Sequence, residues 1–327
     1  MNKFFTIEKF ERILPLIVLF VVGLMTLFQV IAIVKLPPLG DEPQDLAIIA
    51  NDLNNLFFFS NIFSYDQARL PYIISMPLVA VFNEGAFIFL RLFFLVFHLL
   101  FIYFSYKIAK LFTDNKIASY LFALLLVTSC YLSSFSVLTL TSGDNLYLFL
   151  FAVCTFLFAK SFLNLKEKGV FTNYLLLSLF VGLCIASKLF GVLLLIAFFI
   201  FHFFYRKIKV FVRFADFKNL LITDFLFLFL LILINFSNFS NFIKFSSAML
   251  FSLLFLLTIV FYIYRELKNQ NRKMEVNFFT FWAAIIFTSF NLTVIFSPIY
   301  LNFNNILRIF GWVTKWGWSN EQLNFNS

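Results

Sequence analysis

The sequence predicts an all-α protein: a polytopic transmembrane bundle of about nine helices, with surface helices in its first outer loop. Three observations support this fold class. Of the 327 residues, 62% are hydrophobic and only 13% are charged, whereas about a quarter of the residues in a soluble domain are charged. Apolar runs recur at the length that crosses a bilayer. Basic residues gather in alternate connections between these runs.

The same composition excludes several classes of protein. A water-soluble globule could not bury this much apolar surface, and a disordered chain would need low hydrophobicity. Cys130, Cys154 and Cys184 are only three cysteines, all in apolar runs, so a disulfide scaffold is excluded. The net charge of +9 comes from short basic clusters rather than one continuous patch. No nucleic-acid partner is therefore expected.

The apolar runs are long enough to be membrane spans. The first follows Lys3, Lys9 and Arg12, but it is too long for a signal-peptide core and no clear small-x-small cleavage site follows it, so we expect a retained span. The predicted spans cover approximately residues 13–35, 86–106, 117–132, 145–160, 171–186, 189–205, 220–235, 245–263 and 278–297.

Residues 171–205 need a separate argument because they are apolar almost throughout. One helix of that length would extend about 52 Å, which exceeds a hydrocarbon core of about 30 Å. Basic clusters flank the segment on both sides, and both clusters belong on the same side of the membrane. The segment is therefore predicted to be a hairpin of two short helices that turns near 187–189, with Lys188 slightly below the outer surface.

The distribution of basic residues predicts the orientation. With the N-terminus in the cytoplasm, 18 of the 25 Lys and Arg residues lie in cytoplasmic segments and 7 on the other side. Such a bias over short loops follows the positive-inside rule.

The first outer loop, 36–84, is long and acidic, and long ordered loops tend to be functional. Within it, 43–57 places Leu46, Ile49, Leu53 and Leu56 on one face, the spacing of an amphipathic surface helix. Residues 71–82 form a second candidate surface or re-entrant helix. The loop is therefore predicted to be a structured layer over the bundle.

Polar groups gather at this outer face. Asp144 lies where the fourth span begins, Arg91 lies about a turn and a half inside the second, and Lys188 lies in the predicted hairpin turn. Acids and buried cations at one face suggest a site. Each residue also has a structural alternative: Asp144 could cap its helix, and Arg91 and Lys188 could snorkel to the interface.

An ordered set of motifs resembles the membrane half of the C-type (GT-C) glycosyltransferases, similar to the protein O-mannosyltransferases and the aminoarabinose lipid A transferases. The resemblance covers about residues 10–205. Its motifs are Gly40-Asp41-Glu42, Leu70-Pro71-Tyr72, Arg91, Ser142-Gly143-Asp144-Asn145-Leu146 and the segment from Gly182 through Lys188 to Gly191. It implies a catalytic membrane region at 1–205. Residues 206–327 are expected to form C-terminal spans and an interfacial tail, without the soluble domain that members of the family often carry.

The resemblance implies a polyprenyl-phosphate sugar donor and catalysis by Asp41, with Glu42 beside it. In such a transfer the phosphate leaves, so a cation near it stabilises the developing charge. Arg91, Lys188 and Arg69 are the candidates for that cation. Asp41 would take the proton of the attacking acceptor, and direct attack would invert the anomeric centre. Alternatively, Asp41 and Glu42 could cap a helix that starts near Pro43.

No cofactor is required by this chemistry, although Asp41, Glu42 or Asp144 could hold a divalent cation with the donor phosphate. His98 and His202 lie inside spans and are expected to be packed polar residues. The expected partners are the lipid-linked donor, a lipid, glycan or protein acceptor, and membrane lipids. The preferred location is the bacterial inner membrane with a periplasmic active face. The alternative functions are a lipid or polysaccharide transporter or flippase and a truncated, non-catalytic relative.

Overall fold

The computed structural model describes residues 7–37, 43, 46–47, 49–50, 70–82, 85–113, 115–129, 144–163, 170–205, 210–212, 214–236, 241–268, 274–276 and 278–296. Its helices are α1 (Ile7–Lys35), α4 (Leu70–Phe82), α5 (Ala86–Thr113), α6 (Lys116–Thr128), α8 (Asp144–Leu163), α9 (Val170–Ser187), α10 (Gly191–Tyr205), α11 (Phe214–Phe236), α12 (Asn241–Lys268) and α13 (Phe278–Phe296). Two short strands, β1 (Val210–Val212) and β2 (Met274–Val276), complete the described elements.

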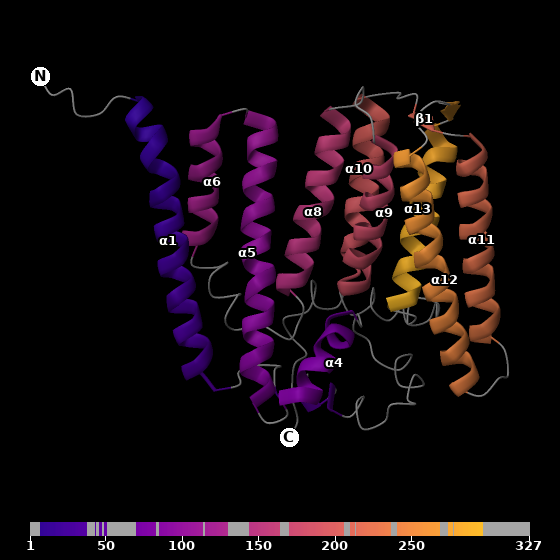
Figure 1. Cartoon of the computed structure of the whole chain (residues 1–327), viewed down its shortest axis with the longest axis horizontal. Coiled ribbons are helices and arrows are strands. Elements are labelled where there is room, and N and C mark those ends of the chain that lie inside the picture. The colour runs from indigo at the N-terminus through magenta and orange to yellow at the C-terminus, as the bar shows by residue number, and fades with distance from the viewer. Residues whose placement is uncertain are drawn as a thin grey trace, which may run out of the picture.

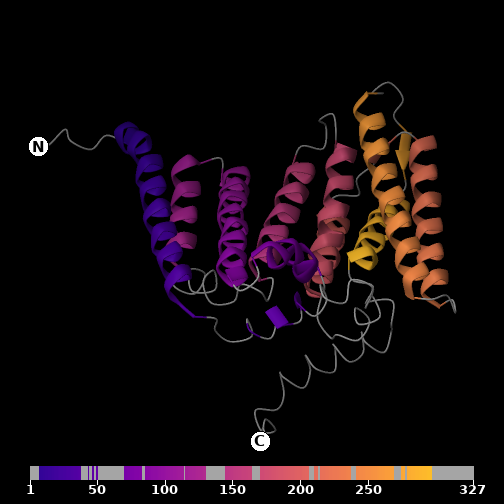
Figure 2. The same ribbon diagram turned by 60° about the horizontal axis from the view of Figure 1, so that its bottom comes forward.

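The long helices stand side by side in a broad row from α1 to α11 (Figure 1). Helix α5 links α1 and α6 to α8, and α9 links α8 to α13 and α12. Lys35, Asp144 and Lys188 come at helix ends that all lie at the lower end of the bundle in Figure 1. We call this the Asp144 end. Figure 2 shows the same row with the Asp144 end turned forward.

Four described helices are long and apolar enough to cross a membrane: Glu11–Lys35, Ala86–Thr113, Asp144–Leu163 and Phe278–Phe296. They indicate an integral membrane protein. The other five predicted spans also coincide with helices, but the apolar segments described within them are 10–17 residues long. The number of nine spans therefore stays a prediction.

Side chains on the outside of the bundle fit a lipid environment. Leu16, Leu19 and Phe20 of α1 are each about two-thirds exposed or more, at 66%, 68% and 70%. A contiguous apolar face of this kind marks contact with lipid or with another protein. Inward, Ile33 of α1 packs with Leu95 of α5, and a second apolar cluster joins the middle of α1 to α5 and α6.

The main buried core lies where α8, α9 and α13 meet. Its largest fully buried side chains include Tyr174 of α9, Phe255 of α12, and Phe281 and Trp282 of α13. The core is continuous across the predicted boundary at residue 205, because it unites side chains from both sides of that boundary. The two predicted regions therefore share one core.

Helices α9 and α13 approach closely along a seam of small residues. Ser289 Oγ donates a hydrogen bond to the Ser178 carbonyl at 2.9 Å, and Thr293 Oγ1 donates to the Gly182 carbonyl at 3.1 Å. A Cβ atom on Gly182 would lie 2.6 Å from the Ser289 carbonyl oxygen. Small side chains are what permits such approach between membrane helices, where close packing and interhelical hydrogen bonds drive association.

The first outer loop is helical in its described residues from 43 to 82. Leu46 and Ile49 lie in helical backbone and pack against the main core, as their predicted apolar face requires. Leu53 and Leu56 lie outside the described residues. The second predicted segment forms α4, which contacts α5 and α9 at the Asp144 end and buries Leu70.

One element departs from the all-α prediction. Strands β1 and β2 form an antiparallel two-stranded ladder in which Val210 faces Val276 and Val212 faces Met274. Each strand is only three residues long and lies between two helices, so it shows neither the length nor the alternation by which a strand is predicted from sequence. The ladder joins the α10–α11 and α12–α13 connections at the end opposite the Asp144 end.

Candidate functional site

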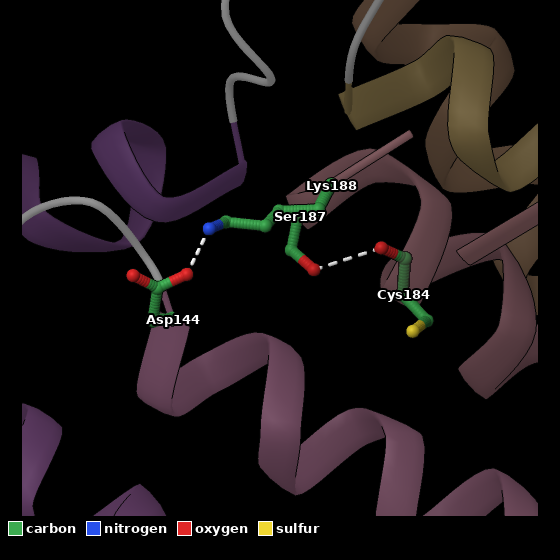
Figure 3. A network of polar contacts seen from close by, with 4 residues as sticks. All are labelled: Asp144, Cys184, Ser187 and Lys188. Atoms are coloured by element: carbon green, nitrogen blue, oxygen red, sulfur yellow. Dashed lines mark hydrogen bonds and ion pairs between the residues drawn. The ribbon is translucent and has the colours of Figure 1, made fainter. Parts of the chain in front are cut away.

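An ion pair between Asp144 and Lys188 forms the centre of the candidate site (Figure 3). Asp144 is the first residue of α8, and Lys188 follows the last residue of α9. The Lys188 ammonium donates to Asp144 Oδ1. The side chains are 32% exposed for Lys188 and 19% exposed for Asp144. The pair is therefore largely enclosed but remains in contact with the surroundings of the bundle.

A tight turn positions Lys188. The Lys188 N–H donates to the Cys184 carbonyl at 3.0 Å, and the Gly191 N–H donates to the Lys188 carbonyl at 2.9 Å. Ser187 Oγ also donates to the Cys184 carbonyl at 2.8 Å (Figure 3). A Cβ on Gly191 would lie 2.7 Å from the Ile185 backbone nitrogen, so only glycine fits this approach. The predicted hairpin is confirmed, and its turn covers residues 188–190.

Two opposing effects act on the charge of Lys188. Burial lowers the pKa of Lys188 below its ordinary value because the charged ammonium loses hydration. The Asp144 carboxylate opposes this effect by stabilising the ammonium. Asp144 is itself favoured by the partial positive charge at the N-terminus of α8. A cation and a helix N-terminus thus converge where an anion can bind.

Next to Asp144, the side chain of Asn145 is buried without a hydrogen-bond partner in the described part of the chain. It is 1% exposed, and neither its Oδ1 nor its Nδ2 is paired there. A buried amide without partners is destabilising, because both polar atoms have lost their hydration. Asn145 therefore supplies an unused donor and an unused acceptor one residue along α8 from Asp144.

Arg91 has different partners from those predicted. Its Nη1 donates to the carbonyls of Ile33 and Leu36 at 3.2 and 2.8 Å, and its Nη2 donates to the Pro37 carbonyl at 2.9 Å. The residue is fully buried. The snorkelling alternative is therefore wrong. The guanidinium instead binds the carbonyls at the C-terminus of α1, which have no partner within their own helix.

Three predicted site residues, Asp41, Glu42 and Arg69, lie outside the described residues. Of the predicted set, the structure brings Asp144 and Lys188 into contact and places Arg91 against the end of α1. Convergence of Asp41 with this pair stays a prediction.

The described ranges offer no cluster of metal ligands, and both histidines lie buried inside helices. These ranges contain no group of three or more His, Cys, Asp and Glu side chains that could hold a metal ion. The divalent cation therefore stays a prediction. His98 and His202 are both buried, as predicted, and His202 Nδ1 accepts a hydrogen bond from Trp282 Nε1 at 3.1 Å.

Sequence reasoning missed Asp224. This carboxylate lies near the middle of α11 and is fully buried. The prediction that acids and buried cations mark a site at the outer face was therefore incomplete. The available signal was a single acid inside an otherwise apolar run, Leu220 to Leu233, because an ionisable residue within a span marks a functional position by default.

Comparison with known proteins adds no relative. No family model matches the chain, and no curated protein or solved structure matches it.

Proposed function

We propose that this protein is an integral-membrane glycosyltransferase of the C-type, which moves a sugar from a polyprenyl-phosphate donor to a lipid, glycan or protein acceptor. The observation that carries the proposal is the Asp144–Lys188 pair at one end of an apolar bundle. A lipid-linked donor needs a cation at the end of an apolar bundle, because its lipid chain stays in the bilayer while its phosphate lies at the membrane surface.

In the proposed complex the donor phosphate replaces Asp144 as the partner of Lys188. The N-terminus of α8 and the Asn145 amide offer further hydrogen bonds to the phosphate or the sugar. Asp144, displaced from Lys188, then accepts a hydrogen bond from a sugar hydroxyl. Arg91 is not assigned to the phosphate, because it already binds three carbonyls of the α1 end.

The transfer balances as a single displacement. The acceptor oxygen or nitrogen forms a bond to the anomeric carbon while the bond from that carbon to the phosphate oxygen breaks. The acceptor proton passes to Asp41, with Glu42 beside it, and polyprenyl phosphate leaves with one additional negative charge. Lys188, with Arg69 as a further candidate, stabilises that charge. Attack opposite the leaving group inverts the anomeric configuration.

The proposed topology follows the basic residues. The N-terminus lies in the cytoplasm, so the Asp144 end faces the other side. In a bacterial inner membrane that side is the periplasm. The ladder between β1 and β2 is consistent with this arrangement, since it pairs two connections that are both assigned to the cytoplasmic side.

Donor binding tests the site. We expect Lys188→Met to weaken the binding of polyprenyl-phosphate sugar to protein in nanodiscs by about tenfold to a hundredfold, because a charge-assisted hydrogen bond contributes about 1.5–3 kcal/mol. Asp144→Asn should tighten the binding of plain polyprenyl phosphate, since it removes the competing carboxylate. Lys110→Met, an exposed lysine at the opposite end, is the matched control. Equal affinity in Lys188→Met and Lys110→Met would reject the site.

Turnover tests the assigned base. We expect Asp41→Asn to insert normally, to bind donor, and to lower the rate of sugar transfer by at least about 100-fold, the contribution of a positioned general base. Unchanged turnover would reject Asp41 as the base. A product that keeps the anomeric configuration of the donor would reject direct displacement. Wild-type protein that binds donor but never transfers it, with varied acceptors, would identify a non-catalytic relative.

One observation favours the alternative of a transporter or flippase. Transport sites contain ionisable groups near the bilayer midplane, and Asp224 is buried near the middle of α11. The two functions differ in their product: a transporter moves the lipid-linked sugar between leaflets unchanged, whereas the proposed enzyme releases polyprenyl phosphate.

A further inference from the structure

The polar cluster around Asp224 lies away from the Asp144 end and has no part in the proposed transfer. Asp224 and Thr288 lie near the middle of α11 and α13, two helices that pack together. Asp224, Thr288 and Asn291 are all fully buried. Polar side chains at this depth are rare in membrane helices, because each must be satisfied without water.

Two hydrogen bonds hold the cluster together. Thr288 Oγ1 donates to Asp224 Oδ2 at 2.5 Å. Asn291 Nδ2 donates to the Asp224 backbone carbonyl at 2.8 Å, which directs the Asn291 amide to the residue that carries the acid. Both contacts join α11 to α13.

Two buried oxygens remain without partners in the described part of the chain: Asp224 Oδ1 and Asn291 Oδ1. Both are acceptors, so neither can satisfy the other. A buried carboxylate with one unpaired oxygen is strongly disfavoured in an apolar medium. What the cluster lacks is a positively charged or hydrogen-donating atom.

The charged residues of the neighbouring elements lie toward the ends of those elements. Helix α13 contains no acidic or basic residue. Helix α12 has its charged residues in its first turn, at Lys244, and in its last turn, at Arg265, Glu266 and Lys268. Strand β2 contains Glu275, and the first turns of α11 contain Asp216 and Lys218. Tyr262 and Tyr264 also lie in the last two turns of α12. One turn from Asp224, Phe227 packs its ring on Phe255 of α12 at 5.5 Å.

We propose that Asp224, Thr288 and Asn291 form a buried proton-binding site between α11 and α13. Asp224 is a neutral carboxylic acid in the folded protein. Its Oδ1 carries the proton and donates it to Asn291 Oδ1, so that one proton satisfies both unpaired oxygens, while Oδ2 accepts from Thr288. This inference does not depend on glycosyl transfer, because it involves none of the residues assigned to the donor.

The variant Asp224→Asn tests the proposal because asparagine reproduces the protonated acid. Its amide nitrogen can donate to Asn291, and its oxygen can accept from Thr288. We expect wild-type protein in nanodiscs to lose a few degrees of melting temperature as the pH rises from about 4 to about 7, because this carboxyl group is ionised in the unfolded chain there but keeps its proton in the folded protein. Asp224→Asn should keep its melting temperature over that range. Glu11→Gln, which changes an exposed acid, is the matched control and should melt like the wild type at every pH.

Infrared spectroscopy supplies a second measurement that does not depend on stability. Wild type should show the carbonyl stretch of a buried, protonated carboxyl group at neutral pH, and Asp224→Asn should lack it. Absence of that band in the wild type would overturn the proposal. A second result would also overturn it: at high pH, Na⁺ raises the melting temperature of the wild type but not that of Asp224→Asn, and a bulky organic cation raises neither. The site between Asp224 and Asn291 would then hold a metal ion instead of a proton.

Discussion

Gly182→Leu is expected to prevent stable folding. The added Cβ would lie 2.6 Å from the Ser289 carbonyl oxygen and 2.8 Å from Leu292 Cβ, so α9 and α13 would have to separate. The two hydrogen bonds that cross the seam, from Ser289 and from Thr293, would lengthen with them. Overpacking alone destabilises by about 1–3 kcal/mol, and interhelical hydrogen bonds contribute about 0.6 kcal/mol each. A total of about 2–4 kcal/mol is therefore expected.

The measurement is the free energy of unfolding in detergent micelles, with the yield of monodisperse protein as a second readout. Gly182→Ala should give an intermediate loss, because its Cβ meets the same carbonyl oxygen without a larger side chain behind it. Gly23→Leu is the matched control: Gly23 lies within α1, and a Cβ there would meet nothing within 4 Å. If Gly182→Leu and Gly23→Leu unfold alike, the α9–α13 seam is not the close contact described.

The seam also links the two polar centres. Ser289 contacts α9 and its neighbour Thr288 contacts α11, so adjacent residues of α13 bind different helices. Lys188 lies six residues after Gly182, at the end of the same helix. The position of the ammonium therefore depends on how closely α9 packs against α13. A seam variant that still folds should weaken donor binding by displacing the ammonium, whereas Lys188→Met removes the ammonium and leaves the α9–α13 seam intact.

Length and charge predicted much of this architecture. The 171–205 hairpin followed from an apolar segment too long for one span with basic flanks on both sides, and the structure places its turn at 188–190. The pairing of Asp144 with Lys188 is consistent with the same argument, because it placed both residues at one end of the bundle. Leu46 and Ile49 pack inward as helical periodicity required.

Partner choice could not be predicted in this way. Arg91 was placed at the correct end, but sequence does not reveal that the carbonyls closing α1 lie within reach of its guanidinium. Asp224 was overlooked because hydropathy averages a single acid into its apolar neighbours, and its partners Thr288 and Asn291 come from a helix more than sixty residues away. Contacts between distant segments decide both roles.

Arg91→Met is expected to release the C-terminal end of α1 from the bundle. Three carbonyls, those of Ile33, Leu36 and Pro37, would lose a charged donor, and two of them belong to residues just beyond the helix. Hydrogen bonds to charged groups contribute about 1.5–3 kcal/mol each, so a loss of about 3 kcal/mol or more is expected. Contacts nearer the middle of α1 still hold the rest of that helix against α5 and α6. We therefore expect release only at the end where Ile33 packs on Leu95. Cross-linking between cysteines introduced at these two positions measures the docking of α1 directly.

Arg91→Lys should restore only part of this stability, because a single ammonium cannot reproduce the planar fork that reaches three carbonyls. Arg12→Met, which removes an exposed arginine near the start of α1, is the matched control and should leave the cross-link unchanged.

The Arg91→Met variant also shows whether Arg91 is a structural or a ligand-binding residue. If Arg91→Met keeps the cross-link and the stability but loses donor binding as Lys188→Met does, Arg91 binds the phosphate and the assignment to α1 is wrong. Loss of the cross-link with donor affinity retained in the folded fraction identifies Arg91 as the residue that holds α1.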